Sequence, residues 1–303
     1  MQAVVFNEFG GPEVLRIEDV PEPHAGPGQV RVRVEAAGVN PVDFKTRRGW
    51  TKGFMDVTFP ATPGMEVGGV VDEVGAGAGF AIGDEVVGWA ATGGYAEHAI
   101  VGNVALKPAG LSWEKAVGVP VAGETAQRVL DELQVKDGET LLLHGAAGAV
   151  GSLAAQLAVA AGVTVIGTAS PANHDFLREL GVIPIAYGEG LVDRVRAAAP
   201  QGIDAVFDTA GYGGLQESIE LRGGTDRIVT IADFQASELG VAVSSRPSVG
   251  PEEIRATLAN QLQSAADGKL RVRIAGTFAL ADAAKAQELS ESGHAPGKIV
   301  ILP

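Results

Sequence analysis

The stretch from Thr140 to His174 limits the possible folds more than any other part of the chain. It holds no Asp, Glu, Lys or Arg, and glycines interrupt its apolar residues. Leu141 to His144 is short and apolar, as a buried strand is, and Ala149 to Ala161 is a run of small residues typical of a helix. Because glycines and a proline break the run, it does not predict a membrane span but a buried strand, turn, helix and second strand.

The turn between this strand and helix reads His144-Gly-Ala-Ala-Gly-Ala-Val-Gly151. A glycine-rich turn in this position is typical of dinucleotide binding, because the free amides that open the helix attract a pyrophosphate. Gly148 would admit the pyrophosphate and Gly151 would let the helix pack on the strand. A purely structural turn is the alternative, since Ala146 replaces the usual first glycine. The predicted cofactor contacts are the backbone groups of Ala147, Gly148, Ala149 and Val150.

The second strand, Val163 to Thr168, ends without the carboxylate that usually binds the ribose hydroxyls of NAD. The first carboxylate after the turn is Asp175. A neutral strand end accepts a 2′-phosphate that an aspartate would repel, so the sequence favours NADPH over NADH. We expect Ser170, Asn173 and His174 to surround that phosphate, with turn and N-cap roles as the alternative.

A change in the pattern of predicted strands and helices divides the chain. Gln29 to Glu35 alternates with period two, and the glycine-rich turn after Val67 to Val74 indicates hairpins, so the first part is barrel-like and antiparallel. Strands then alternate with helical stretches, which is typical of a parallel sheet with crossover helices. Arg246-Pro247 interrupts that pattern. These patterns predict an α/β chain with boundaries near residues 118 and 247: a β-rich part of residues 1–118, a parallel-sheet part of residues 119–247, and a last part of residues 248–303 with two helices and two strands.

The later elements are predicted from the same patterns. The expected strands are Ala205–Asp208, Arg227–Ile231, Val241–Ser244, Leu270–Ile274 and Lys298–Leu302. The expected helices are His174–Leu180, Glu252–Ala266 and Ala281–Ser292.

Composition excludes several classes of function. The chain has 37 acidic and 23 basic residues and a formal charge of −14, so we expect no nucleic-acid partner. It has no cysteine, which excludes disulfides and thiolate ligands for zinc. Met1 to Arg16 shows no basic segment followed by an apolar one, so we expect a cytoplasmic protein without a membrane partner.

Short segments spread over nearly the whole chain resemble those of medium-chain dehydrogenases/reductases, specifically the zinc-free quinone oxidoreductase branch. The resemblance implies a GroES-like catalytic domain built from both chain ends, a Rossmann doubly wound domain between them, and NADPH as the cofactor. The segments are, in order, Met1-Gln-Ala-Val-Val-Phe6, Gly10-Gly-Pro-Glu-Val-Leu15, Ala36-Ala-Gly-Val-Asn-Pro-Val-Asp43, Gly64-Met-Glu-Val-Gly-Gly-Val-Val71, Gly83-Asp-Glu-Val86, Gly94-Tyr-Ala-Glu97, Ala122-Gly-Glu-Thr-Ala126, the turn ending at Gly151, and Gly297-Lys-Ile-Val300.

Relatives that oxidise alcohols bind a catalytic zinc through a Cys, a His-Glu pair and a further Cys or Asp. Asn40 stands at the first Cys position and Met65 at the His position, and a thioether does not replace imidazole for zinc. We therefore predict no metal, and Glu66 is expected to be a buried or inter-domain polar group. Without a Lewis acid the acceptor must already be electrophilic, as a quinone or an α,β-unsaturated carbonyl is.

The resemblance also implies individual site residues. Asn40 would donate a hydrogen bond to the acceptor carbonyl, or would only be a turn residue before a proline. Thr125 would lie near the nicotinamide, or would only be the N-cap of a helix from Ala126 to Leu133. Tyr187 matches a tyrosine that contacts the 2′-phosphate in relatives, with edge packing as the alternative. The other predicted cofactor contacts, made by backbone at the carboxyl ends of strands, are Ala210 and Ile231.

The loop after Asn40 implies no substrate preference, because it lacks the tyrosines that some quinone reductases carry there. Lys45 could orient or protonate an acceptor, although a solvated surface lysine is favoured. Trp50 and Phe54 could line a flat aromatic pocket or simply pack in the core. His24, His98 and His294 are expected to be ordinary surface or hydrogen-bonded histidines.

Two other functions stay open from the sequence. An enoyl-thioester or polyketide-tailoring enoyl reductase would need basic residues for an acyl carrier, for which Lys45, Arg47 and Arg48 are the candidates. A non-catalytic NADPH-binding protein would have the same fold. Relatives dimerise through the edge strands of their Rossmann sheets, so a homodimer through Val241 to Ser244 is expected.

Overall fold

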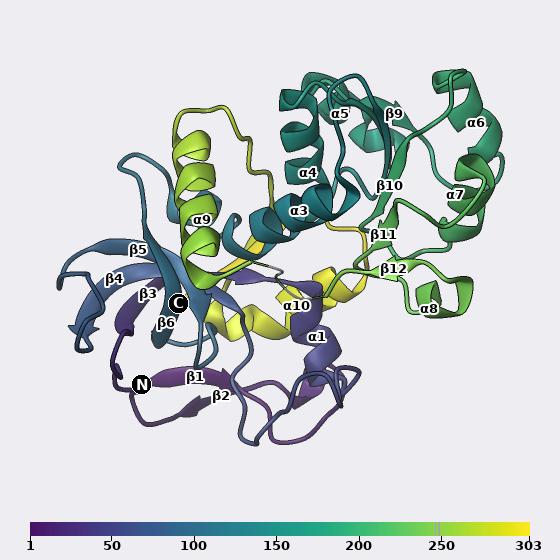
Figure 1. Ribbon diagram of the computed structural model, residues 1–303. Helices are drawn as coiled ribbons and strands as arrows, with labels where there is room; N and C mark the ends of the chain where they lie inside the picture. Colours follow the sequence, from purple (N-terminus) through teal and green to yellow (C-terminus); the bar gives the residue numbers. More distant parts are fainter. Residues whose placement is uncertain (246, 248) are drawn as a thin grey trace. The chain divides into compact units, whose positions relative to one another are not determined.

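The computed structural model describes residues 1–245, 247 and 249–303, and the chain forms two compact units (Figure 1). The first unit comprises Met1–Val121 and Val249–Pro303, and the second comprises Ala122–Ser248. Arg246, where the sequence pattern breaks, lies outside the described residues. Among the described residues, no helix is both long and apolar enough to cross a bilayer.

The first unit is built on a six-stranded sheet in the order β13-β14-β3-β4-β5-β6. Because β3 also pairs with β6, the four strands from β3 to β6 close into an antiparallel barrel, which confirms the predicted barrel-like fold. A separate two-stranded sheet joins β1 to β2. The strands are β1 (Gln2–Val5), β2 (Arg16–Asp19), β3 (Val30–Val39), β4 (Glu66–Val74), β5 (Glu85–Ala90), β6 (His98–Leu106), β13 (Ile274–Ala279) and β14 (Lys298–Leu302).

Alternating side chains place the core of this unit inside the barrel. Val30, Val32 and Val34 on β3 are buried, and Arg31 and Arg33 between them reach outward. Removal of these valines from water contributes about 25 cal/mol for each Å² of apolar surface. The alternation that predicted a strand is therefore the pattern that closes the barrel around its core.

The strand predicted over Leu270–Ile274 is wrong in position, because β13 begins where that prediction ends. Leu270 and Val272 are buried, which produces the alternating pattern, but pairing with β14 starts only at Ile274 opposite Lys298. The buried side chains belong to the core without making the backbone a strand.

Helices of the first unit connect and cover these strands. Pro41 opens α1, at the first helical position where its missing N–H costs nothing. The predicted C-terminal helices are both present, with somewhat shorter ends for the second. The helices are η1 (Pro12–Val14), α1 (Pro41–Arg47), α2 (Trp113–Ala116), α9 (Pro251–Ala266), η3 (Leu280–Asp282) and α10 (Ala283–Glu291), and α3 (Pro120–Leu133) starts where the unit ends.

The second unit contains a fully parallel sheet in the order β12-β11-β10-β7-β8-β9. In chain order this is the 3-2-1-4-5-6 arrangement of doubly wound nucleotide-binding sheets, and the order reverses between β7 and β10. The strands are β7 (Thr140–His144), β8 (Thr164–Thr168), β9 (Ile183–Ile185), β10 (Ala205–Asp208), β11 (Ile228–Thr230) and β12 (Ala242–Val243).

The helices of the second unit follow the strands in the chain, as the alternating pattern predicted (Figure 1). Every residue of β7 is buried, as expected for a central parallel strand with both faces covered. The edge strand β12 has two exposed residues. The helices are α4 (Ala149–Ala160), η2 (Pro171–Asn173), α5 (His174–Glu179), α6 (Leu191–Ala198), α7 (Leu215–Arg222) and α8 (Ala236–Leu239).

Candidate active site

The glycine-rich turn lies at the carboxyl end of β7, beside the point where the strand order reverses. Gly148 is the N-cap of α4, and the helical ladder begins with the N–H of Ser152, which donates to the Gly148 carbonyl. The N–H groups of Ala149, Val150 and Gly151 precede that ladder and open the helix. A turn of this form is a ready anion site, because these amides and the helix dipole favour negative charge.

Two glycines of the turn have different steric roles. A Cβ on Gly151 would lie 2.3 Å from the Gly145 carbonyl oxygen, so only glycine lets the helix pack on the turn. A Cβ on Gly148 would meet only that same oxygen, at 3.3 Å. A methyl group at position 148 therefore requires only a small shift of the Gly145 carbonyl, and the glycine there leaves room next to the helix start for a phosphate.

Neighbouring strand ends hold the turn in place. Thr168 lies at the end of β8. Its hydroxyl oxygen accepts a hydrogen bond from the N–H of Gly145, and its carbonyl oxygen accepts one from the N–H of Ala146 at 3.1 Å. Thr209, directly after β10, donates from its hydroxyl to the His144 carbonyl at 2.7 Å. Gly145 adopts a φ of 72°, where glycine is favoured. These hydrogen bonds and this backbone conformation hold the turn in place.

The residues predicted to surround a 2′-phosphate cluster at one end of the sheet. The Asn173 amide donates to the Ser170 hydroxyl at 3.0 Å, and a ring nitrogen of His174 lies 3.2 Å from the Ala169 carbonyl oxygen. Thr168, the last residue of β8, pairs with Ile185, the last residue of β9. Ser170 and the exposed Tyr187 each lie two residues beyond these paired strand ends. Ser170 also occupies the N-cap position of η2, but its side chain makes no capping hydrogen bond there.

Arg194 is a basic residue of this region that the sequence analysis missed. Its guanidinium, on α6, donates to the Ala186 carbonyl at 2.9 Å and to the Gly188 carbonyl at 3.0 Å, and so encloses the turn that carries Tyr187. The charge lies close to Tyr187 although it follows it by seven residues. A basic residue in the first turn of the helix after β9 would have been the signal.

Ala210 and Ile231 lie at the carboxyl ends of β10 and β11, as predicted. The N–H of Ala210 donates to the Asp208 carboxylate at 2.9 Å, and the N–H of Ile231 donates to the Asp208 carbonyl at 3.1 Å. Since both N–H groups are used within the protein, the carbonyl oxygens are the backbone groups that can bind a ligand.

The first unit positions Asn40 between the end of β3 and the start of α1. Its backbone N–H donates to the Asp43 carboxylate at 2.9 Å, and its side chain is 5 % exposed. The Asn40 amide nitrogen donates to Glu66 at 2.8 Å, and the Lys298 ammonium donates to the Asn40 amide oxygen at 2.8 Å. Lys298 and Glu66 also form an ion pair. Glu66 is fully buried, as predicted.

A second buried carboxylate adjoins this cluster. Burial raises the pKa of Asp43 to about 6, against the hydrogen bonds from Asn40 and Tyr95 that lower it. The Tyr95 hydroxyl donates to Asp43 at 2.8 Å, and burial raises the pKa of Tyr95 well above its ordinary value. The sequence showed no sign of this pair, because 52 residues separate its members.

Thr125 lies inside α3, so the alternative role as N-cap of a helix from Ala126 to Leu133 is wrong. Pro120 opens this helix six residues before Ala126. Thr125 is buried, and its hydroxyl lies 3.4 Å from the Glu124 carboxylate. Thr125 nevertheless lies within the first two turns of α3, near the start of the helix.

In the segment after Asn40, the burial of three side chains differs from what the sequence led us to expect. Lys45 is half-buried, and that burial lowers the pKa of its ammonium, so it is not a fully solvated lysine. Trp50 and Phe54 are 56 % and 46 % exposed, which excludes simple core packing. Arg47 is fully buried and donates to the Glu291 carboxylate at 3.0 Å, so it offers no charge at the surface.

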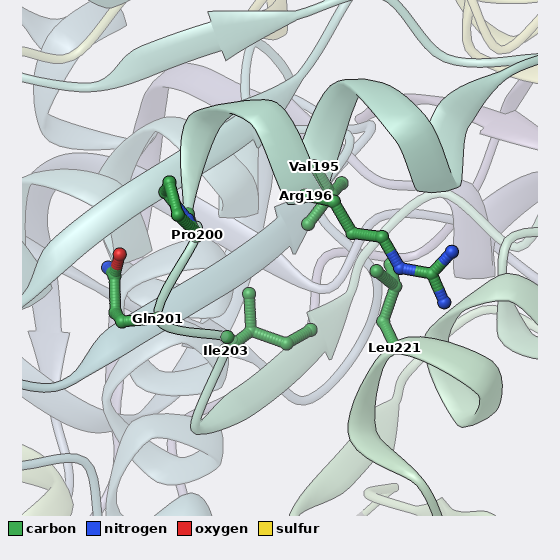
Figure 2. A pocket seen from close by; sticks show the side chains of 8 residues that line it. Val195, Arg196, Pro200, Gln201, Ile203 and Leu221 are labelled. Atoms are coloured by element: carbon green, nitrogen blue, oxygen red, sulfur yellow. The ribbon is translucent and has the colours of Figure 1, made fainter.

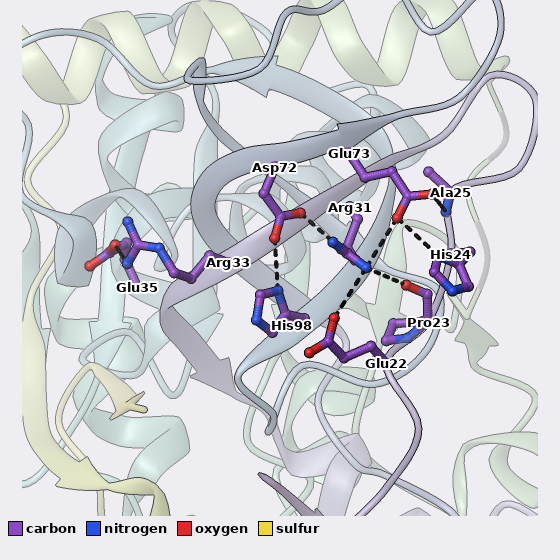
Figure 3. A network of polar contacts seen from close by, with 10 residues as sticks. All are labelled: Glu22, Pro23, His24, Ala25, Arg31, Arg33, Glu35, Asp72, Glu73 and His98. Atoms are coloured by element: carbon purple, nitrogen blue, oxygen red, sulfur yellow. Dashed lines mark hydrogen bonds and ion pairs between the residues drawn. The ribbon is translucent and has the colours of Figure 1, made fainter. Parts of the chain in front are cut away.

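A polar network on β3 and β4 is structural (Figure 3). The Arg31 guanidinium lies 2.9 Å from Asp72 and 3.0 Å from Glu73, and these carboxylates raise its pKa. A ring nitrogen of His24 hydrogen-bonds to Glu73 Oε2, the oxygen that also contacts Arg31. Nδ1 of His98 lies 2.9 Å from Asp72 Oδ2 but forms no hydrogen bond, so the expectation of a hydrogen-bonded histidine holds for His24 and not for His98. Arg31 provides the positive charge at the centre of this network. Among the described residues no group of three or more His, Asp or Glu side chains could bind a metal.

The second unit has a hollow of about 400 Å³. Figure 2 shows the side chains that line it, and none of the lining residues belongs to the glycine-rich turn. The hollow is lined by α6, α7 and the segment before β10, including Val195, Ile203 and Leu221. This is the amino end of β10, whereas doubly wound sheets bind ligands at the carboxyl ends of their strands. The hollow is therefore not part of the candidate site.

An antiparallel barrel and a doubly wound sheet with a phosphate-type turn, joined in one chain, are the fold of two-unit dehydrogenases and reductases. Family models agree: that of the alcohol dehydrogenase GroES-like domain matches residues 26–130, and one described as zinc-binding dehydrogenase matches residues 182–301.

Individual relatives cover the whole chain. It is 33% identical over 321 residues to 2-methylene-furan-3-one reductase of Solanum lycopersicum, covering 100% of this chain and 79% of the relative. It is 32% identical over 324 residues to quinone oxidoreductase of Lama guanicoe, covering 100% and 97%. The crystal structure of Escherichia coli quinone oxidoreductase complexed with NADPH has a TM-score of 0.88 at 26% identity, covering 100% of both chains. The chain belongs to the medium-chain dehydrogenase/reductase superfamily, and within it to the quinone oxidoreductase type.

Proposed function

We propose that this protein transfers a hydride from NADPH to a quinone or an α,β-unsaturated carbonyl compound without zinc. The observation that carries the proposal is the glycine-rich turn at the reversal of strand order, followed by a strand end without a carboxylate. Relatives named as quinone and enone reductases, and one structure bound to NADPH, support it.

NADPH fits the second unit. The backbone of Ala147 to Val150 would bind the pyrophosphate, because Gly148 leaves space and the first amides of α4 point out of the helical ladder. The 2′-phosphate would be bound by Ser170, Asn173, His174 and Tyr187, with the positive charge of Arg194 nearby. Thr125 would orient the carboxamide end, and the carbonyls of Ala210 and Ile231 would contact the cofactor.

Zinc does not fit the equivalent position in the first unit. Asn40 and Met65 replace two of the usual ligands, and the ammonium of Lys298 is bonded to both Asn40 and Glu66. A fixed positive charge at these atoms repels a divalent cation. The family description as zinc-binding dehydrogenase therefore does not extend to this site.

The chemical role of the protein is then to position and polarise. NADPH supplies the hydride when bound, and the acceptor needs a hydrogen bond where negative charge develops on its carbonyl oxygen. We assign that hydrogen bond to the amide N–H of Asn40. Loss of such a donor costs about 10²–10³-fold in kcat.

The two alternative functions, an enoyl reductase acting on a carrier protein and a non-catalytic NADPH-binding protein, differ from the proposed one in the surface they require and in turnover. An acyl carrier would require Lys45, Arg47 and Arg48 at the surface, but Arg47 is fully buried and both arginines pair with Glu291. The structure therefore favours a small acceptor over an enoyl thioester on a carrier protein. A non-catalytic NADPH-binding protein would bind the cofactor and reduce nothing.

The test is the initial rate of loss of reduced-nicotinamide absorbance, with NADPH and NADH in parallel. The acceptors are an ortho-quinone, a para-quinone and a simple enone, each with and without a chelator. We expect turnover that prefers NADPH, is insensitive to the chelator, and falls about 10²–10³-fold in Asn40→Ala. Asn7→Ala, at an exposed asparagine of the same unit, is the control and keeps the wild-type rate. Tight NADPH binding without turnover on any acceptor would refute the proposal.

We further propose that the chain is a homodimer through the edge strand β12. Its residues are exposed and end the sheet, and Val243 is 50% exposed. Light scattering at micromolar concentration should give twice the chain mass, and Val243→Lys should halve it. The control is Ile183→Lys on β9, the opposite edge, which should stay dimeric. A monomeric wild type contradicts this proposal.

The cytoplasmic location and the limits of the catalytic domain (1–118 and 248–303) and the NADPH-binding domain (119–247) stay predictions. Fractionation of source cells tests the location. Separate expression of residues 119–247 with an NADPH titration tests the domain limits.

A further inference from the structure

The side chain of Asn40 is held by two charged groups of opposite sign. Its amide nitrogen donates to Glu66 Oε1 at 2.8 Å, and its amide oxygen accepts from Lys298 Nζ at 2.8 Å. The three residues are at most 5 % exposed. We refer to Glu66 and Lys298 below as the orienting pair.

Strand pairing brings these residues together. Asn40 follows β3, Glu66 begins β4, and Lys298 begins β14, and the three strands are neighbours in the order β14-β3-β4. Gly38 pairs with Glu66, and a Cβ on it would lie 2.3 Å from Glu66 Oε1 and 2.7 Å from Lys298 Cε. Gly38 thus provides the space in which the two charged side chains reach Asn40.

The orienting pair is itself fixed. Glu66 uses its second oxygen, Oε2, to accept the backbone N–H of Val121 at 2.7 Å, in the first turn of α3. Its first oxygen accepts from Asn40 and from Lys298. With both oxygens bonded, the carboxylate cannot rotate without loss of a buried hydrogen bond.

Donor and acceptor chemistry then permits only one orientation of the Asn40 amide. A carboxylate only accepts hydrogen bonds and an ammonium only donates them, whereas an amide has one end of each kind. A rotation of 180° would place N–H against the ammonium and C=O against the carboxylate. Both contacts would be repulsive in a buried site.

We propose that Glu66 and Lys298 are positioning residues that hold the Asn40 amide in this orientation, so that its second N–H is directed to the acceptor carbonyl. The inference rests on the proposed function, because it explains how the hydrogen-bond donor of that reaction is kept in place. The pair touches neither acceptor nor cofactor in this role. In the opposite orientation Asn40 would present an oxygen to the developing oxyanion and would slow the reaction.

The decisive variant is the double change Glu66→Gln with Lys298→Met. It removes both charges together, so no unpaired buried charge remains. The introduced glutamine can donate or accept, and the introduced methionine replaces a pure donor by a weak acceptor, so the Asn40 amide is no longer restricted to one orientation. We expect kcat to fall about tenfold to a hundredfold, while the KM for NADPH changes by less than about twofold. Lys298→Arg keeps a pure donor and should retain most of kcat.

The matched control is Glu85→Gln with Lys107→Met. It makes the same two substitutions at another lysine–glutamate pair of the first unit, where the Lys107 side chain is 6% and the Glu85 side chain 50% exposed. Any loss of stability from removal of an ion pair should appear in both double variants. The fall in kcat should appear only in the variant of the orienting pair.

A second readout does not depend on turnover. The chain has five asparagines, Asn7, Asn40, Asn103, Asn173 and Asn260, so selective ¹⁵N-asparagine labelling gives few side-chain NH₂ signals. Loss of one signal pair in Asn40→Ala assigns it. In the wild type we expect one downfield-shifted proton, bonded to the carboxylate, and the Glu66→Gln and Lys298→Met double variant should lose that shift. If the double variant does not fold, Glu66→Asp serves, because it keeps the negative charge beside Lys298 but shortens the side chain and so weakens the hydrogen bond to Asn40.

The outcomes separate this inference from the proposed function. An unchanged kcat or an unchanged Asn40 signal in the double variant overturns the inference, as does an equal loss of kcat in the control pair. A wild type that reduces no acceptor, but shows the shifted Asn40 signal and its loss, overturns the proposed function and leaves the orientation of Asn40 established.

Discussion

Replacement of Asp43 by asparagine should remove the part of the pH dependence of the unfolding free energy that comes from this carboxyl group. Asp43 is buried, and its carboxylate accepts the Asn40 N–H at 2.9 Å and the Tyr95 hydroxyl at 2.8 Å. Burial raises its pKa from 3.8 to about 6. An asparagine at this position keeps an acceptor oxygen and cannot ionise.

The sign follows from the raised pKa. The folded state binds the proton more tightly than the unfolded state, so this group stabilises the fold fully below pH 3.8 and loses that effect as pH rises through about 6. A shift from 3.8 to about 6 corresponds to about 3 kcal/mol, at about 1.4 kcal/mol for each pH unit. Part of this effect is already lost at pH 4, so between pH 4 and pH 7 Asp43→Asn should gain about 2 kcal/mol in unfolding free energy relative to the wild type.

Urea unfolding at several pH values measures this difference. All three tryptophans, Trp50, Trp89 and Trp113, lie in the first unit, so their fluorescence follows the unit that contains Asp43. The control is Asp84→Asn, at a more exposed aspartate that also accepts a backbone N–H. Parallel pH curves for Asp43→Asn and the wild type would refute the reasoning, as would a wild type that gains stability with pH relative to the variant.

Three further outcomes are expected in the second unit. Gly151→Ala places a methyl group 2.3 Å from the Gly145 carbonyl oxygen, and melts followed by circular dichroism should show a loss of about 1–3 kcal/mol. Gly148→Ala meets that oxygen only at 3.3 Å, so the fold should persist while NADPH affinity, measured by fluorescence titration, falls about tenfold or more; equal affinity would exclude the phosphate role of this turn. Burial lowers the pKa of His144 in the folded protein below its ordinary value of 6.5. The neutral side chain therefore contributes to the unfolding free energy above pH 6.5, and this contribution is lost as pH falls below that value. His144→Gln should flatten the acid side of the stability profile, and an unchanged profile would show that His144 is not the group responsible.

The sequence alone determined the features that depend on local pattern. The alternation of β3, the apolar run of β7 and the glycine-rich turn after it each predict their own element, because side-chain periodicity and backbone freedom act within a few residues. The parallel sheet with its crossover helices followed from the alternation of strands and helices. Errors arose where local signals have two causes: burial without strand pairing at Leu270 and Val272, and a helix whose first residue is Pro120 rather than Ala126.

Only the tertiary structure decided how the candidate site is held. Asn40 was predicted from a resemblance, but its partners lie 26 and 258 residues away in the chain. They meet because β14, β3 and β4 pair side by side, and no local pattern encodes which distant strands become neighbours. The same pairing buries Glu66 with Lys298 and makes their charges strong enough to direct an amide. The sequence thus determines which chemical groups the chain carries, and long-range strand pairing determines which of them act on one another.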